Sequence, residues 1–429
     1  MLMDPNADRW QHCLEYAALS DVGLRRSNNQ DSMAVATAGS QTAWEKRGHL
    51  FMVADGMGAH AAGELASQMA VDAVPLVYHK LGELHPAEAL HRAMVAANQQ
   101  IFERGEASDD FRGMGTTAST LVLLPQGALV AHCGDSRVYR LRDTTFEQLT
   151  FDHSLVWEMS AAGRIPENEV PDYVPKNIIT RSLGPGDEAE IDLEGPFPIE
   201  TGDTFLLCSD GLSGPVRDEE MGTIAGCLPP EEAARTLVDL ANLRGGPDNI
   251  TVIVVRVTGP QVANNDARTQ PTKAPIVYRP VHPLLWALSG ALGLGTLGMV
   301  VLGQYTLALA GLIATLVLTA LVLIERCGGN MSLEDWTGQV FGKGPHRTYD
   351  CTPNAEFVDR LSRVVEQLRD AATNEDWKID WHRFNQIQSD ADAATFAAKY
   401  PAAVRLYCHA LCFMMGELRN QQPGRQDHS

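Results

Sequence analysis

The first part of the chain combines short apolar runs with longer amphipathic stretches. The apolar runs are rich in β-branched residues and predict buried strands at Leu50 to Ala54, Ala118 to Leu124, Thr204 to Cys208 and Ile250 to Val257. Apolar residues at helical spacing predict helices over 63–80 and 86–104, and shorter ones near 154–163, 218–226 and 231–243. Strands followed by paired long helices indicate an α+β domain in which helices cover a sheet.

The two long predicted helices each carry one apolar face, which we expect to be buried against the sheet. The face of the first helix is formed by Leu65, Met69, Ala73 and Val77, and that of the second by Leu90, Met94, Ala97 and Ile101. A mixed segment from Trp10 to Leu19 predicts an edge strand. Residues 152–186 are rich in Pro and Gly and predict a mobile insertion near the functional site, wherever that site lies.

The pattern changes after residue 258. Residues 259–282 are rich in Pro, Asn, Gln and Thr and predict a linker. Residues 283–324 contain no charge, and this run is long enough for two membrane spans of about 20 residues each. We expect the spans at 284–302 and 305–324. Basic residues flank both outer ends of the run, and because such residues stay on the cytoplasmic side, we expect both ends in the cytoplasm. A buried globular hairpin is the alternative, which the unbroken apolar run disfavours.

The last part of the chain predicts a separate helical domain at 351–420, after a connector at 325–350. Its apolar faces include Phe357, Leu361, Val364, Leu368 and Ala372, then Trp377, Trp381 and Phe384, then Tyr400, Ala403, Tyr407 and Ala410. A bundle of three or four helices explains this spacing better than a single tetratricopeptide-type unit. The aromatic stripe then belongs to the core of the bundle and not to a ligand site.

Composition restricts the classes of function. The net charge of −20 argues against nucleic acid as a partner, and 45% apolar residues allow a full core in a chain of 429 residues. The eight cysteines include no Cys-x-x-Cys pair, which favours buried free thiols in a reducing compartment. Residues 1–9 have no apolar core, so we expect no secretory signal.

Aspartates recur where predicted strands end. Asp55, Asp135, Asp210 and Asp248 stand at strand ends or adjacent turns, and Asp31 comes just before a strand. Carboxylates with few histidines nearby select hard cations such as Mg²⁺, Mn²⁺ or Ca²⁺. Several fixed carboxylates repel one another unless cations bind, which favours at least two. Two such metals make a phosphatase or nuclease type of site, where an arginine would grip phosphate in bidentate fashion.

Six motifs in these regions resemble the bacterial form of the metal-dependent protein phosphatases of the PP2C type (PPM family). They are Ser20-Asp-Val-Gly-x-x-Arg26-x-x-Asn-Gln-Asp31, Asp55-Gly-Met-Gly-x-His60-x-x-Gly63-Glu64, Met114-Gly-Thr-Thr117, Gly134-Asp-Ser-Arg137, Ser209-Asp-Gly-Leu212 and Gly246-Pro-Asp-Asn-Ile-Thr251. The resemblance covers roughly residues 10–258. It implies a sandwich of two antiparallel β-sheets flanked by helices, within a phosphatase domain at 1–258.

The resemblance also implies roles for matching residues. Asp55 should bridge two Mn²⁺ or Mg²⁺ ions, with the Gly56 carbonyl on one ion and Asp210 and Asp248 on the other. Asp31 should bind a metal ion directly or hold one of its ligands, and Asp135 should hold a third, weaker ion. Arg26 should bind the phosphate of the substrate, so that Arg26 and Asp55 are the catalytic residues.

Two positions depart from the pattern of relatives. Met57 stands where the animal enzymes have a histidine proposed as general acid, and the nearby His60 is a weak candidate for that role because it can equally pack at the start of a helix. A metal-bound water could protonate the leaving group instead. Gln30 replaces a glutamate, which is expected to weaken one water-mediated metal contact.

These observations predict a membrane-anchored enzyme that hydrolyses phosphoserine and phosphothreonine in proteins by a hydroxide that bridges two metal ions. Its partners would be phosphoproteins, namely bacterial serine/threonine kinases or their targets, and the membrane through 283–324. One alternative is a non-catalytic signalling module of the same fold that works through its helical C-terminal domain. Another is a two-metal hydrolase acting on small phosphoesters or nucleic acid.

Overall fold

The structure is a computed structural model that describes residues 13–58, 61–163, 178–263 and 339–421, and isolated positions between 295 and 312. In these residues the strands form two six-stranded sheets with antiparallel pairing throughout. The first sheet has the order β1 (Leu14–Asp21), β11 (Ile250–Val257), β10 (Thr204–Cys208), β7 (Arg137–Arg142), β8 (Thr145–Gln148) and β12 (Arg347–Asp350). The second has the order β2 (Asp31–Ala36), β3 (His49–Met57), β5 (Ala118–Leu124), β6 (Gly127–Cys133) and β9 (Asp192–Phe197), with β4 (Gly115–Thr116) paired to β3.

The two sheets pack face to face, and strand alternation separates two cores. In β10, Phe205 and Leu207 lie in the core between the sheets, whereas Leu206 and Cys208 face the helices outside. The predicted sandwich of two antiparallel sheets is therefore confirmed. The four runs predicted as buried strands all lie in β3, β5, β10 and β11.

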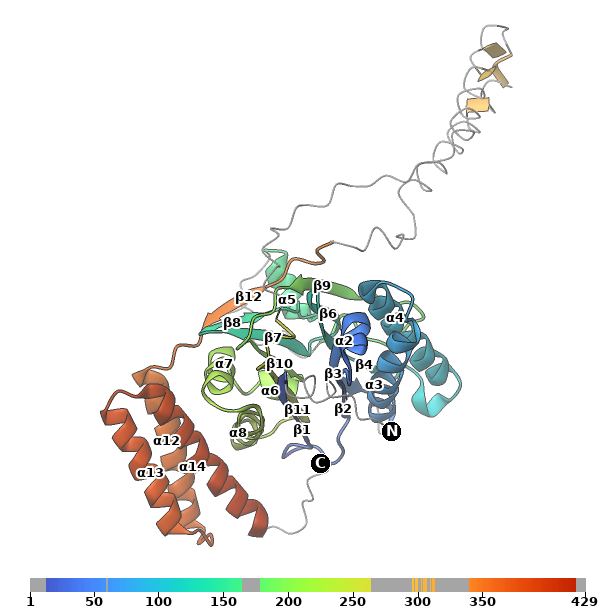
Figure 1. Cartoon of the computed structure of the whole chain (residues 1–429). Helices are drawn as coiled ribbons and strands as arrows, with labels where there is room; N and C mark the ends of the chain where they lie inside the picture. Colours follow the sequence, from blue (N-terminus) through green and yellow to red (C-terminus); the bar gives the residue numbers. More distant parts are fainter. Residues whose placement is uncertain are drawn as a thin grey trace, which may run out of the picture. The chain divides into compact units, whose positions relative to one another are not determined.

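Helices cover the outer face of each sheet (Figure 1). The second sheet carries α3 (Ala62–Lys80) and α4 (Pro86–Glu106), and the first carries α7 (Asp218–Cys227) and α8 (Pro230–Leu243). Shorter helices are α2 (Gln41–Arg47), η1 (Asp109–Phe111), α5 (Leu155–Ala161) and α6 (Asp210–Ser213). The predicted apolar face of α4 is confirmed, because Leu90, Met94, Ala97 and Ile101 are all buried.

The predicted face of α3 was right at Ala73, which is buried, and wrong at its three larger residues. Leu65, Met69 and Val77 are only half-buried, and the buried positions are mostly small. They include Ala62, Gly63, Ala66, Ala70, Ala73 and Val74. Small side chains let the helix backbone approach the sheet closely. The buried face of α3 is therefore its face of small residues, and the larger apolar residues lie beside it.

The C-terminal region consists of β12 and three helices, α12 (Ala355–Asn374), α13 (Trp381–Phe396) and α14 (Tyr400–Gln421). α14 packs on α7 and α8, and all three helices share one hydrophobic core with the outer face of the first sheet. The described residues of the C-terminal region and those of the phosphatase region thus belong to one compact unit. A C-terminal helical region is confirmed, and the exact domain boundaries stay a prediction.

The predicted membrane hairpin at 283–324 lies outside the described residues, apart from the isolated positions between 295 and 312. Most of the linker at 259–282, the first half of the connector, His60 and the centre of the insertion, 164–177, also lie outside them. In the part of the chain that the structure describes, no helix is both long enough and apolar enough to cross a membrane.

Candidate active site

Five aspartates from distant parts of the sequence meet at one end of the two sheets. Asp31 begins β2 and lies directly opposite Asp55 of β3 in the strand register. Asp210 begins α6 directly after β10, and Asp248 lies in the turn before β11. Asp135 lies in the turn between β6 and β7. The predicted convergence of these carboxylates follows from the antiparallel topology, which brings these strand ends together.

Two glycines allow the loops of the site to approach each other. A Cβ on Gly56 would overlap the carbonyl oxygen of Gly63, where α3 begins. A Cβ on Gly211 would overlap the carbonyl oxygen of Asn249. The Asp-Gly pairs of the sequence therefore mark close backbone contacts at the site and not only turns.

A frame of hydrogen bonds orients the carboxylates. Ser209 Oγ donates to Asp31 Oδ2 (2.7 Å) and accepts from the Thr251 N–H (3.0 Å). The side chain of Asn249 accepts from the Gln30 N–H (2.8 Å) and donates to the carbonyls of Val22 and Asn28 (both 2.9 Å). Ser209 and Asn249 stand in the motifs quoted above, but no role was predicted for either of them from the sequence.

A second set of hydrogen bonds ties the Asp135 turn to the strand of Asp55. Thr117 accepts from the Asp55 N–H through Oγ1 (2.9 Å) and donates its own N–H to the Asp55 carbonyl (2.8 Å). The same Oγ1 lies 2.7 Å from Ser136 Oγ, directly after Asp135. Thr117 and Ser136 are thus supporting residues; both stand in the motifs quoted above, where no role was predicted for them.

Burial and mutual repulsion raise the pKa of four of these carboxyls. Burial, the largest cause in each, and neighbouring aspartates raise the pKa of Asp31 to about 7 and that of Asp135 to about 8. The same two causes hold the pKa of Asp55 well above its ordinary value and raise that of Asp210. Such groups become stable carboxylates at neutral pH only with cations close by.

The residues present fit a site for divalent cations. Asp31, Asp135 and Asp210 each have a buried Oδ1 that has no hydrogen-bond partner among the described residues. A buried acceptor without a donor is costly, and a hard cation is the natural partner for an all-oxygen set. As the side chains lie, no three Asp, Glu, His or Cys groups in the described ranges converge on one point. Two of the five aspartates are turned toward other partners: Asp31 accepts a hydrogen bond from Ser209, and Asp248 pairs with Arg26.

Arg26 lies at the rim of the cluster. Its Nη2 is 2.6 Å from Asp248 Oδ2, and its side chain is 49% exposed. The hydrogen bond to Asp248 is the main cause that raises the pKa of the guanidinium, with further contributions from Asp55 and Asp210. A half-exposed arginine beside a carboxylate cluster can reach an anionic ligand from solvent.

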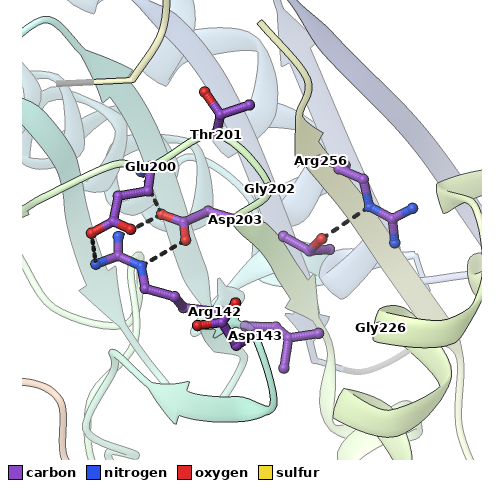
Figure 2. Close-up of a pocket in the computed structure, with 10 residues that line it drawn as sticks. Arg142, Asp143, Glu200, Thr201, Gly202, Asp203, Gly226 and Arg256 are labelled. Carbon is purple, nitrogen blue, oxygen red and sulfur yellow. Dashed lines mark hydrogen bonds and ion pairs between the residues drawn. The ribbon is translucent and has the colours of Figure 1, made fainter. Parts of the chain in front are cut away.

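A polar cavity of about 160 Å³ lies at the opposite end of β10 and β11 (Figure 2). Arg142 there binds Asp203 (2.8 and 2.7 Å) and Glu200 (2.7 Å). Arg256 donates to the carbonyls of Ala225 and Leu228 where α7 ends. Both arginines are engaged in holding strand and helix ends together, so we assign this cavity a structural role.

The two-sheet fold and its oxygen-only cluster define a class, the hydrolases that act on phosphoesters with divalent cations. Comparison with known proteins narrows this class to one family. The profile of the family described as Protein phosphatase 2C matches residues 25–235. The protein phosphatase PhpP of Streptococcus pneumoniae is 39% identical over 248 residues, which are 56% of this chain and 97% of PhpP. The serine/threonine protein phosphatase PstP of Mycobacterium tuberculosis is 38% identical over 265 residues, 61% of this chain and 48% of PstP.

Solved structures agree. The crystal structure of the M. tuberculosis phosphatase PstP/Ppp has a TM-score of 0.50 at 37% identity and covers 57% of this chain and 99% of that one. The phosphatase Stp1 of Staphylococcus aureus has a TM-score of 0.51 at 30% identity and covers 57% and 96%. The PstP catalytic domain has also been crystallised with two manganese ions, at a TM-score of 0.48.

The chain belongs to the bacterial PP2C-type serine/threonine phosphatases. It is a protein serine/threonine phosphatase, and its substrates as a class are phosphoproteins. The alternatives of a non-catalytic module and of a hydrolase for nucleic acid or small phosphoesters are therefore set aside.

Proposed function

We propose that Asp55, Asp210 and Asp248, with the Gly56 carbonyl, hold the two catalytic Mn²⁺ or Mg²⁺ ions of this phosphatase. Asp31 supports them, and Asp135 holds a third, weaker ion. The observation that carries this assignment is the set of buried carboxylate oxygens on Asp31, Asp135 and Asp210 that have no hydrogen-bond donor among the described residues.

In this proposal the bound ions supply a water of lowered pKa as nucleophile and neutralise charge on the phosphate. Arg26 exchanges its carboxylate partner Asp248 for the phosphate of the substrate, whose oxygens match the planar guanidinium. Ser209 keeps Asp31 in one orientation while charge develops. Met57 cannot transfer a proton, so the leaving serine or threonine takes its proton from water at the site.

The enzyme is further proposed to be anchored in the cell membrane by two spans within 283–324, with the phosphatase and C-terminal regions in the cytoplasm. The uncharged run of residues 283–324 and the basic residues at its outer ends support this placement. In that position its substrates would be bacterial serine/threonine kinases or the proteins that such kinases phosphorylate. Recovery of the full chain in the membrane pellet after a carbonate wash is expected, and release into the supernatant would contradict anchoring.

The catalytic assignment is tested with the purified full chain and a phosphothreonine peptide. We expect phosphate release with Mn²⁺, none with EDTA, and a loss of at least about 10³-fold in Asp210→Asn, because two-metal catalysis needs both ions in place. Asp110→Asn replaces an exposed aspartate on η1 and is the matched control. Full activity in Asp210→Asn, or release that EDTA does not affect, would refute the assignment.

A further inference from the structure

A buried glutamate on the edge of the second sheet is enclosed by residues that follow the uncharged run. The side chain of Glu194 in β9 is only 5% exposed. The Gly344 N–H donates to its Oε2 (2.8 Å), and His346 Nε2 lies 2.9 Å from its Oε1. Gly342 has a φ of +70°, and a Cβ there would overlap the Glu194 carboxyl group. The glycines of this loop therefore allow the backbone to wrap around a carboxylate.

Residues 341–351, which we call the strap, cover an edge of both sheets. Phe341 and Gly195 exchange two backbone hydrogen bonds at the edge of the second sheet (3.1 and 2.5 Å). β12 pairs with β8 at the edge of the first sheet. Beyond β12, Cys351 donates its N–H to the Thr144 carbonyl (2.7 Å), and its sulfur fills the space left by the missing side chain of Gly222. The strap is thus docked along its whole length.

The strap also contacts two aromatic rings beside the active site. Arg347 lies over the ring of Trp157 in α5, with its Cζ 4.2 Å from the ring centroid. His346 meets the ring of Phe151 edge-on, with centroids 5.6 Å apart. Phe151 and Trp157 stack on each other at 5.0 Å. Removing Arg347 or His346 would therefore loosen the segment from Phe151 to Trp157.

The residues after Phe151 hold the turn that carries Asp135. Both carboxylate oxygens of Asp152 bind Arg137 (2.7 to 3.1 Å). His153 binds Gly134 twice, accepting from its N–H at Nδ1 (3.0 Å) and donating its own N–H to the carbonyl (2.7 Å). Gly134 and Arg137 flank Asp135 on either side, so residues 151–153 connect the strap to both sides of this turn.

The geometry points to Arg347 and His346 as positioning residues for the phosphatase reaction, which act through residues 151–153 to fix the Asp135 turn and so set its affinity for a cation. This inference rests on the proposed role of Asp135 as a metal ligand. In relatives whose match ends with the phosphatase region, other residues would have to support this turn.

The test measures Mn²⁺ binding by calorimetry and Mn²⁺-dependent activity in the full chain. Arg347→Ala is expected to weaken the weakest Mn²⁺ site by about tenfold, as the loss of a supporting residue typically does, and to raise the Mn²⁺ concentration for half-maximal activity in proportion. Arg347→Lys keeps the charge over the Trp157 ring and should restore most of the affinity. Arg369→Ala removes an exposed arginine of α12 and is the matched control.

A double-mutant cycle separates positioning from a general loss of structure. In an Asp135→Asn background, Arg347→Ala should have no further effect on Mn²⁺ binding, because its route of action is already removed. Hydrogen exchange should quicken at residues 151–157 in Arg347→Ala while the melting temperature changes little. Unchanged Mn²⁺ binding in Arg347→Ala, alongside a weakened site in Asp135→Asn, would overturn the strap inference alone. Unchanged Mn²⁺ binding in Asp135→Asn would instead overturn the proposed role of Asp135 as a metal ligand. The proposed action of the strap through residues 151–153 would then fail with it.

Discussion

Arg26 Nη2 lies 2.6 Å from Asp248 Oδ2, so the guanidinium proposed for phosphate is bound to a carboxylate proposed for metal. A cation at Asp248 and a phosphate at Arg26 would each weaken this ion pair. Binding of metal and of substrate should therefore favour each other, because each frees the partner that the other needs.

The first prediction concerns Arg26→Ala. We expect kcat/KM for a phosphothreonine peptide to fall by about 10²- to 10³-fold, since a charge-assisted bidentate contact to phosphate is lost. Mn²⁺ affinity should not fall, because Asp248 loses a competitor. Arg26→Lys should recover only part of the activity, and Arg25→Ala, at the exposed neighbouring position, serves as control. Weaker Mn²⁺ binding in Arg26→Ala would show that the ion pair supports the metal site instead of competing with it.

The second prediction concerns the stability of the protein in EDTA. Because burial raises the pKa of Asp31 to about 7 and that of Asp135 to about 8, the folded protein binds more protons than the unfolded chain around neutral pH. Stability in EDTA should therefore fall as the pH rises from 6.5 to 8.5. Saturating Mn²⁺ replaces those protons and should remove the decline, so the stabilisation by Mn²⁺ grows with pH.

Thermal unfolding at several pH values, with EDTA or Mn²⁺, measures this effect. The residue at position 31 cannot titrate in Asp31→Asn, so stability in EDTA should fall less steeply with pH; the part of the decline due to Asp135 remains. The same substitution at Asp110 on η1 controls for the loss of an exposed carboxylate. A melting temperature in EDTA that is constant or rises across this window would contradict the argument.

The third prediction concerns acid unfolding and His49, which lies far along β3 from the site. Its ring lies tilted against that of Trp44, with the centroids 4.9 Å apart, and its Nδ1 accepts from the Ala38 N–H. Burial lowers its pKa to about 4. The unfolded chain binds the additional proton below about pH 6.5. Stability should thus be lost as the pH falls from 6.5 to 4, by on the order of 3 kcal/mol from this residue.

Urea unfolding between pH 4 and 7 in EDTA tests this, read as a difference between variants. His49→Gln should have a shallower decline than the unsubstituted chain, whatever its stability at pH 7. His382→Gln, at an exposed position of α13, controls for the loss of a histidine from the unfolded chain. If the free energy of unfolding fell equally steeply with pH in His49→Gln and in the unsubstituted chain, His49 would not be a cause of acid unfolding.

Most of the strands predicted from the sequence have uninterrupted apolar runs, as in β5 and β11. Among the strands that were missed, β9 and β12 have a clear physical reason. β9 contains Gly195 and Pro196, and β12 has only four residues between glycine-rich and proline-rich segments. Neither has a periodic pattern of its own, and each is defined by a partner strand far away in the sequence. Their joint role around Glu194 was therefore invisible before the structure.

The site was predictable to the extent that its residues end strands. Asp55 and Asp210 follow apolar runs and precede glycines, so their position and rigidity can be derived locally. The supporting residues cannot, since Asn249 binds Gln30 from 219 positions away, and His153 supports Gly134 across a turn whose geometry depends on both sheets. A hydroxyl or an amide gains such a role only when the topology supplies its partner.

The fourth prediction concerns the contact between the C-terminal helices and the phosphatase. Asp239 of α8 has a side chain that is 0% exposed, and it forms an ion pair with Arg419 of α14. Burial raises the pKa of Asp239, and the hydrogen bond and charge of Arg419 oppose that rise. Arg419→Met would leave this carboxylate buried without its cation, which should reduce the free energy of unfolding by about 3 to 5 kcal/mol.

Urea unfolding of the full chain measures that loss, and Asp239→Asn combined with Arg419→Met should recover part of it, because no unpaired charge then stays buried. Arg369→Met breaks an exposed pair with Asp370 and should change stability by less than about 1 kcal/mol. Since α14 shares its hydrophobic core with α7 and α8, both regions should unfold in one transition. Two separate transitions, with only the first shifted in Arg419→Met and phosphatase activity retained after it, would contradict this. The C-terminal helices would then fold as an independent domain, connected to the Asp135 turn through the strap.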